Sequence, residues 1–123
     1  KGFYPDIVVP KALAVGPKIQ GTFAKAYKKG VGIAFGTDAG VFKHGNNGKE
    51  FGYMVAAGMP AIETIQAATI TNAKILKMET EIGQVSKGFY ADIIAVDENP
   101  VKNISTMENV VFVMKNGIVY KNK

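Results

Sequence analysis

A carboxylate and an imidazole stand close together in a glycine-rich stretch of this chain, and both side chains can carry protons. Asp38 is flanked by Gly36 and Gly40, and His44, the single histidine, follows six residues later. A carboxylate in such a loop can ligate a cation such as Zn²⁺ or accept a proton from water, but it can also simply bond to the loop backbone. His44 could be a ligand, a proton carrier or a substrate contact, with a solvent-exposed loop residue as the equal alternative.

Polar residues after His44 offer further candidates, and their spacing gives most of them a structural interpretation. Asn46 and Asn47 are predicted to be turn and cap residues, with substrate contact as the alternative. Asn47 and Glu50 have the spacing of a capping box, so Glu50 is interpreted as a helix-cap partner rather than a catalyst. Because a catalytic zinc site usually takes about three ligands from the protein, one histidine and no cysteine cannot complete one.

The elements around Asp38 predict how the chain delivers it. Val31–Phe35 is an apolar run without polar alternation, as expected for a strand covered on both faces of a parallel sheet. A helix is predicted from Pro17, which suits the first helical position, to Lys29, with Gly30 closing it. Helix, tight turn and buried strand make an α/β unit, and such folds place functional groups in the loops after the strands.

The rest of the chain divides into a helical part and a small β part. Two more helices are predicted, over about 48–57 and 60–77, the second with a candidate interruption at Thr71-Asn72. In the last third of the chain, Asn116-Gly117 between two apolar runs is a strong signal of a β-hairpin. A short extended piece is also predicted at 7–9, before the first helix.

The composition argues against several classes of protein. With 123 residues the chain makes one domain, or one domain with a small appendage, and is too short for a complete eight-fold barrel of about 250 residues. The net charge of +5 rests on fifteen scattered lysines without arginine or a stacking pattern of aromatics, which argues against nucleic-acid binding. No apolar run approaches the roughly 18 residues of a membrane span. The absence of cysteine is typical of a reducing compartment, so we expect a cytoplasmic rather than a secreted protein.

The order of the motifs resembles the amidohydrolase superfamily. The likeness begins at Gly32–Gly40 and continues through His44-Gly45-Asn46 to Glu50. Further matching pieces follow in the same order: Ala57–Pro60, Ile65–Thr69, Asn72–Lys74, Ile82-Gly83, Lys87-Gly88, Ala91–Ile93, Asn99-Pro100 and Lys115–Gly117. Each piece is weak alone, but the shared order is specific, and the resemblance covers nearly the whole chain from residue 17 onward. The imidazolonepropionase-like and Xaa-Pro dipeptidase (prolidase-type) branch is the most similar one.

This resemblance implies an α/β fold that is part of a larger barrel. Residues 1–79 would be the C-terminal portion of a metal-dependent (β/α)8 barrel, with its last strand at Val31–Phe35 and the helices around it. Residues 80–123 would be half of a small β-sandwich built from both ends of a longer parent chain. The other barrel strands would then lie upstream of residue 1.

The resemblance also implies roles for two residues, Asp38 and His44. Asp38 matches the last-strand aspartate of the family, which binds one metal and shuttles the proton of the attacking water. His44 matches a loop histidine of this branch near the substrate, and Asn46 in the same turn is predicted to be a second substrate contact. The implied cofactor is zinc, as one or two divalent ions, whose other ligands in the family (paired histidines, a carboxylated lysine and middle-strand histidines) have no counterpart here.

The expected function is therefore metal-dependent hydrolysis of amide or peptide C–N bonds in a full-length parent, with this chain alone inactive. Dipeptides or N-acyl amino acids are the predicted substrates, and neither nucleic acid nor membrane is expected as a partner. A cyclic-amide (imidazolone-type) hydrolase and a non-catalytic structural or interaction module are the alternatives. Without the rest of the barrel, exposed apolar surface is expected to promote self-association or a homo-oligomer.

Overall fold

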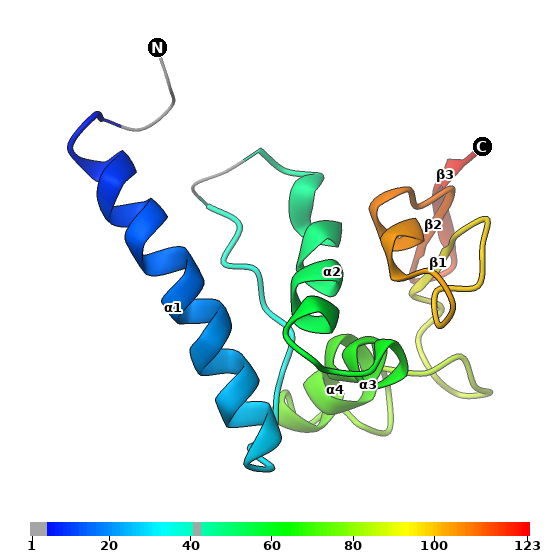
Figure 1. Ribbon diagram of the computed structural model, residues 1–123. Coiled ribbons are helices and arrows are strands. Elements are labelled where there is room, and N and C mark those ends of the chain that lie inside the picture. The colour runs from blue at the N-terminus through cyan, green and yellow to red at the C-terminus, as the bar shows by residue number, and fades with distance from the viewer. Residues whose placement is uncertain (1–4, 41–42) are drawn as a thin grey trace.

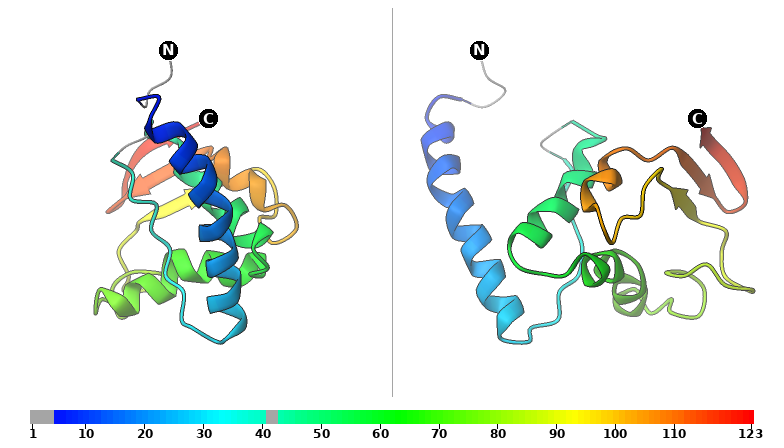
Figure 2. Two further views of the ribbon diagram at one scale, coloured as in Figure 1. Left: turned by 60° about the vertical axis from the view of Figure 1, so that its left-hand side comes forward. Right: turned by 45° about the vertical axis from the view of Figure 1, so that its right-hand side comes forward.

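The structure is a computed structural model that describes residues 5–40 and 43–123. The elements, in chain order, are α1 (Val8–Lys28), the 3₁₀ turn η1 (Asn46–Gly48), α2 (Lys49–Ala56), α3 (Ala61–Gln66), the π-helical turn η2 (Ala67–Thr71), α4 (Asn72–Ile75), β1 (Ile93–Ala95), the 3₁₀ turn η3 (Ile104–Glu108), β2 (Phe112–Lys115) and β3 (Ile118–Asn122). Helices α2 to α4 lie between α1 and the sheet (Figures 1 and 2). The described residues thus form an α/β fold with a small antiparallel sheet.

The first helix is longer than the sequence predicted. α1 begins at Val8, so residues 7–9, predicted to be extended, are turn and helix instead, and Pro17 lies inside the helix rather than at its start. An interior proline removes one backbone hydrogen bond. The residues Lys11–Ala14 before it are strong helix formers, and their helical preference offsets the loss of that one hydrogen bond. The predicted end is close, because Gly30 follows the helix with a φ of +77°.

Residues 31–37 run between α1 and α2 without helix or strand, and we call them the extended segment (Figure 1). No strand forms here within the described residues, contrary to the prediction, because a strand needs a neighbouring strand to complete its ladder of hydrogen bonds. The backbone is tied to helices instead. The Phe35 N–H donates to the Ala67 carbonyl oxygen at 3.3 Å, and the Asn72 side-chain amide donates to the Phe35 carbonyl oxygen at 2.9 Å. Ile33 and Phe35 are half-buried while Ala34 is exposed, so only one face of the segment is covered.

The core lies where this extended segment meets the helices. Its buried centre is Met54, Met59 and Ala67, and four partly buried side chains pack against it: Phe23, Tyr27, Ile33 and Phe35. The rings of Phe35 and Phe51 are 4.4 Å apart between centroids in a tilted arrangement. Aromatic pairs in such offset geometry attract beyond the area that they bury. The apolar run before Asp38 is therefore fixed by packing as well as by hydrogen bonds.

The two later helices follow the prediction closely. α2 ends before Gly58, whose φ of +100° turns the chain away. The helical run from α3 through η2 to α4 is continuous, and the π-helical turn ends at Thr71, beside the predicted interruption. Such single π-helical turns occur within α-helices and widen the helix locally. Ala67, which receives the Phe35 N–H, lies at the start of that turn.

The β part is a three-stranded antiparallel sheet in the order β1-β2-β3, and it contains the predicted hairpin. Asn116 and Gly117 both have positive φ, +49° and +78°, as a two-residue type I′ turn requires. Asp92 locks this turn, because its carboxylate accepts the Asn116 N–H at 2.7 Å and a charged hydrogen bond from Lys115. The hydrogen bond from Lys115, followed by that from Asn116, holds the pKa of Asp92 below its ordinary value.

Much apolar surface stays exposed. α1 has no buried residue, and the side chains of Leu13 and Ile19 are 72% and 63% exposed. Exposed apolar side chains in such number are typical of surfaces that pack against further protein. Within the described ranges, no helix has both the length and the apolar character that crossing a membrane takes.

The hairpin turn gives a test of the fold. Gly117→Ala places a side chain at a φ of +78°, which costs about 1–2 kcal/mol, so the free energy of unfolding should fall by about 1 kcal/mol in denaturant titrations. Gly52→Ala in α2 is the matched control. An added methyl there meets no atom within 4 Å, and alanine favours the helix by roughly 0.5–1 kcal/mol. A stabilised Gly117→Ala variant would contradict the left-handed turn.

Candidate functional site

Asp38 sits in a sharply bent loop with an uncommon backbone conformation. Its φ is +46°, in the left-handed region, where side chains other than glycine cost about 1–2 kcal/mol. Aspartate is among the residues that tolerate this region best. The Gly40 N–H donates to the Asp38 carbonyl oxygen at 2.8 Å and closes the bend, and Asp38 is exposed. Outliers of this kind cluster at functional sites, so the conformation supports the prediction that Asp38 has a function.

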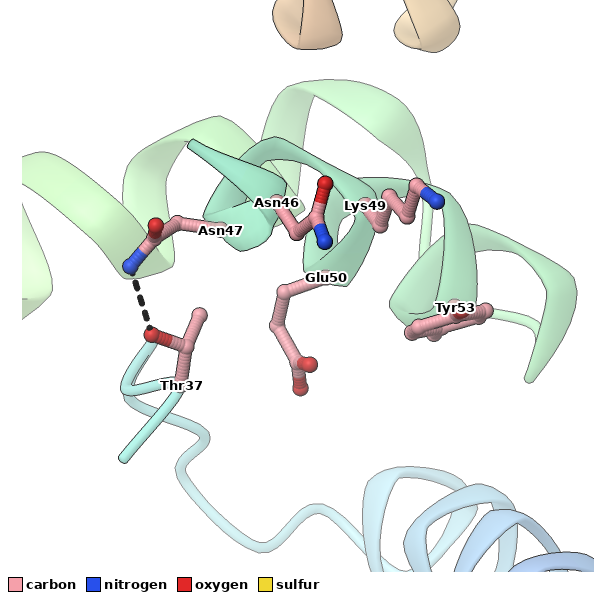
Figure 3. A pocket seen from close by; sticks show the side chains of 6 residues that line it. All are labelled: Thr37, Asn46, Asn47, Lys49, Glu50 and Tyr53. Carbon is pink, nitrogen blue, oxygen red and sulfur yellow. Dashed lines mark hydrogen bonds between the residues drawn. The ribbon is translucent and has the colours of Figure 1, made fainter. Parts of the chain in front are cut away.

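His44 and Asn46 both lie in the turn that leads into α2. His44 precedes Gly45, which has a φ of +100°, and the Asn46 N–H donates to the Lys43 carbonyl oxygen at 3.3 Å. Both side chains are exposed, and Asn46 lines a hollow beside the extended segment (Figure 3). Asn46 therefore shares this hollow with Thr37, which precedes Asp38, whereas His44 is not among the residues that line it.

The described residues do not complete a metal site. No three of their histidine, aspartate or glutamate side chains are grouped to hold an ion. Asp38 is an exposed carboxylate in an open loop, so its chemistry fits one ligand of a divalent ion. A working centre would need ligands from outside the part of the chain that the structure describes.

The side chain of Asn47 has a partner that the sequence did not reveal. The predicted capping box with Glu50 does not form, since Gly48 occupies the cap position of α2 and no side chain bonds there. Instead, the Asn47 Oδ1 accepts the Gly45 N–H at 3.2 Å, and its Nδ2 donates to the Thr37 hydroxyl at 3.1 Å (Figure 3). Asn47 thus joins the turn before α2 to the segment that carries Asp38.

The hollow beside these residues has a volume of about 280 Å³, and we call it the site hollow. It lies between the extended segment and the first turns of α2, and its lining is polar apart from one aromatic ring: Thr37, Asn46, Asn47, Lys49, Glu50 and Tyr53 (Figure 3). Residues 46, 50 and 53 follow the spacing of one helix face, so this lining was readable from the sequence once α2 was placed.

Glu50 lines the site hollow rather than capping the helix. Its carboxylate points into the hollow from the first turn of α2 (Figure 3). Burial raises the pKa of Glu50 above its ordinary value, because desolvation disfavours the charged form. The sequence-based interpretation of Glu50 as a helix-cap partner missed this position in the site hollow.

This fold and this loop define an α/β protein with a polar site at the end of an extended segment that is covered on one face. Residues 9–120 match the family described as "Amidohydrolase family". The chain therefore belongs to the amidohydrolase family, as its motif order predicted.

Individual relatives make the likeness more specific. A solved structure described as a Xaa-Pro dipeptidase with bound methionine in the active site is 56% identical, covers 97% of this chain with a TM-score of 0.89, and is matched over 29% of its own length. Ochratoxinase from Aspergillus niger is 35% identical over 78% of this chain and 21% of its own length. A 5-methylthioadenosine/S-adenosylhomocysteine deaminase from Caldanaerobacter subterraneus subsp. tengcongensis is 32% identical over 76% of this chain and 27% of its own length.

These matches confirm the predicted prolidase-type branch, and they show how much of each relative's length the chain covers. It spans 21–29% of the length of these three proteins. The family supports hydrolase chemistry in general. Asp38, His44 and Asn46 stay predicted site residues.

Glu50 gives a test based on pH. Its folded-state pKa is raised, so the folded protein binds more protons than the unfolded chain just above pH 4.5, and stability falls as the pH rises through the raised pKa. Glu50→Gln removes this loss. The measurement is thermal unfolding at a series of pH values. The variant should gain stability relative to the wild type as the pH rises toward neutral, and this difference should shrink below pH 4.5.

Glu79→Gln removes the same charge from an exposed residue outside the site hollow and is the matched control for net charge. A stability difference between wild type and Glu50→Gln that stays constant across the pH range would contradict the burial of the Glu50 carboxyl.

Proposed function

We propose that this chain is the C-terminal part of a longer metal-dependent hydrolase that cleaves amide or peptide C–N bonds. Dipeptides or N-acyl amino acids are its proposed substrates. The observation that carries the proposal is the 56% identity, over 97% of this chain, to a structure described as a Xaa-Pro dipeptidase. The positive φ of Asp38 adds independent support, because it marks a strained loop at the predicted catalytic position.

The proposal includes the division of the chain into two parts. Residues 1–79 belong to a barrel whose last strand is the extended run before Asp38, and residues 80–123 belong to a β-sandwich. In support, the extended run lies between α1 and α2 and pairs with no strand among the described residues, so the backbone groups that the helices do not hold can pair with strands from elsewhere. The exposed side chains of Leu13 and Ile19 on α1 are the kind of surface that such a barrel covers.

In the proposed reaction, Asp38 moves the protons. One carboxylate oxygen of Asp38 accepts a proton as water attacks the substrate carbonyl carbon. The same oxygen then gives that proton to the amide nitrogen, the C–N bond breaks, and an acid and an amine leave. His44 and Asn46 contact the substrate from the turn before α2. A divalent ion, zinc in this proposal, supplies the acidity of the attacking water and polarises the carbonyl when its full ligand set is present.

The neighbours also support a second candidate reaction. The 32% identity to a deaminase, over 76% of this chain, favours a hydrolase that releases ammonia from a ring-bound amino group. A cyclic-amide hydrolase of the imidazolone type is a further alternative within the same family. Release of amino acid from dipeptides or N-acyl amino acids supports the first proposal, and release of ammonia without amino acid supports the second.

The role of Asp38 is tested by Asp38→Asn in the full-length protein. Asparagine keeps the shape of the side chain and tolerates positive φ, so the fold should survive. Loss of the proton acceptor should lower kcat by about 10²–10⁴-fold or more. Asp97→Asn, at an exposed position in the turn after β1, makes the same chemical change away from the site and should leave kcat unchanged. Near-normal turnover by Asp38→Asn would rule the assignment out.

The metal is tested by elemental analysis of the full-length protein. We expect one or two divalent ions per chain, loss of hydrolysis on chelation and recovery on adding zinc. Purified, folded protein with neither bound metal nor hydrolysis would support the non-catalytic module instead.

A further inference from the structure

We infer that Asn47 is a positioning residue that holds the Asp38 loop and the His44 turn in one arrangement. This inference rests on the proposed function, since it assigns Asn47 a role in placing the two predicted site residues relative to each other. Asn47 itself is not proposed to touch the reacting atoms.

The two hydrogen bonds of the Asn47 amide reach the immediate neighbours of both residues. Its Oδ1 accepts the N–H of Gly45, which follows His44, at 3.2 Å, and its Nδ2 donates to the hydroxyl of Thr37, which precedes Asp38, at 3.1 Å. The backbone N–H can only donate, so the oxygen of the amide must face Gly45 and the nitrogen must face Thr37. The bond to Thr37 joins the two segments (Figure 3), and the bond from Gly45 sets the orientation of the planar amide.

Asn47 stands on a rigid support. It lies in η1, which continues directly into α2, and α2 buries Phe51 and Met54. Its neighbour Gly48 packs so closely on η3 that an added Cβ would come within 2.5 Å of the Met107 carbonyl oxygen. The entrance to α2 therefore cannot shift easily, and a bond from Asn47 transmits that fixed position to Thr37.

The loop that Asn47 holds has few other restraints. On the side of the extended segment, the backbone is anchored at Phe35 by the bonds to Ala67 and Asn72. Among the residues that the structure describes after Phe35, the bond between Asn47 and Thr37 is the hydrogen bond that links the Asp38 loop to the turn before α2. Asn47 also does not cap a helix, so these two bonds are the contribution of its side chain.

The experiment measures kcat and KM for variants of the full-length protein on the substrate that it hydrolyses. Misplacement of a reacting group by about 1 Å can cost on the order of 100-fold in rate. Asn47→Ala should therefore lower kcat by about 10- to 100-fold, with the larger part of the loss in kcat rather than in KM. Thr37→Val, which removes only the hydroxyl partner, should lower kcat in the same direction, and Thr37→Ser should restore it.

Two controls separate positioning from general stability. Asn99→Ala also removes an asparagine whose side chain makes a local hydrogen bond, since its Oδ1 accepts the Val101 N–H at 2.9 Å, but in the β part of the chain. It should lose stability and keep its kcat. The double variant Asn47→Ala with Thr37→Val should be no slower than Asn47→Ala alone, because both changes break the same bond.

The outcomes also separate this inference from the proposed function. Full turnover by Asp38→Asn overturns the proposed function itself. Loss of turnover in Asp38→Asn, together with kcat values within about twofold of wild type for Thr37→Val and Asn47→Ala, overturns only the positioning role. Fully additive losses in the double variant, or no recovery in Thr37→Ser, also overturn it. If Asn47→Ala fails to fold, the pair Thr37→Val and Thr37→Ser decides the question alone.

Discussion

The backbone of Phe35 is the point on which the geometry of the site depends. Its N–H and its carbonyl oxygen are both held by the helical run, through Ala67 and Asn72, and its ring packs on Phe51 of α2. A peptide group that loses water without gaining a partner costs free energy. These bonds therefore fix the position at which the segment crosses the helices. Phe35 is thus the anchor nearest to the Asp38 loop on the side of α1.

The sequence predicted most of the elements because their signals are local. The Asn116-Gly117 turn needs only two residues that accept positive φ, and both adopt it. α2 and the helical run behind it follow from apolar spacing within a few turns. The predicted start of α1 was wrong because a proline is compatible with the first position of a helix and, at a cost, with its interior. Pro17 lies in the interior, and its own residue type could not distinguish the two positions.

The site was less predictable because its bonds are not local. The Asn47 side chain donates to Thr37, ten residues earlier, and the Asn72 side chain donates to Phe35, thirty-seven residues earlier. Spacing along one helix assigned Asn47 to a capping box with Glu50, since nothing in the local pattern reveals a partner from another segment. The family resemblance did single out the stretch around Asp38 and His44, and the two loops that carry them are those that Asn47 joins.

The strained conformation of Asp38 fits this arrangement of anchors. A non-glycine residue at positive φ persists only when the surrounding structure leaves it no alternative. Here the chain is fixed at Phe35 before the loop and at Thr37 by the bond to Asn47, and the Gly40 N–H closes the bend behind Asp38. The loop is thus held on its N-terminal side by these bonds, and the bend at Asp38 is closed by the Gly40 N–H. These bonds restrain the loop that presents the Asp38 carboxylate, which is the kind of preorganisation that the proposed proton transfer would need.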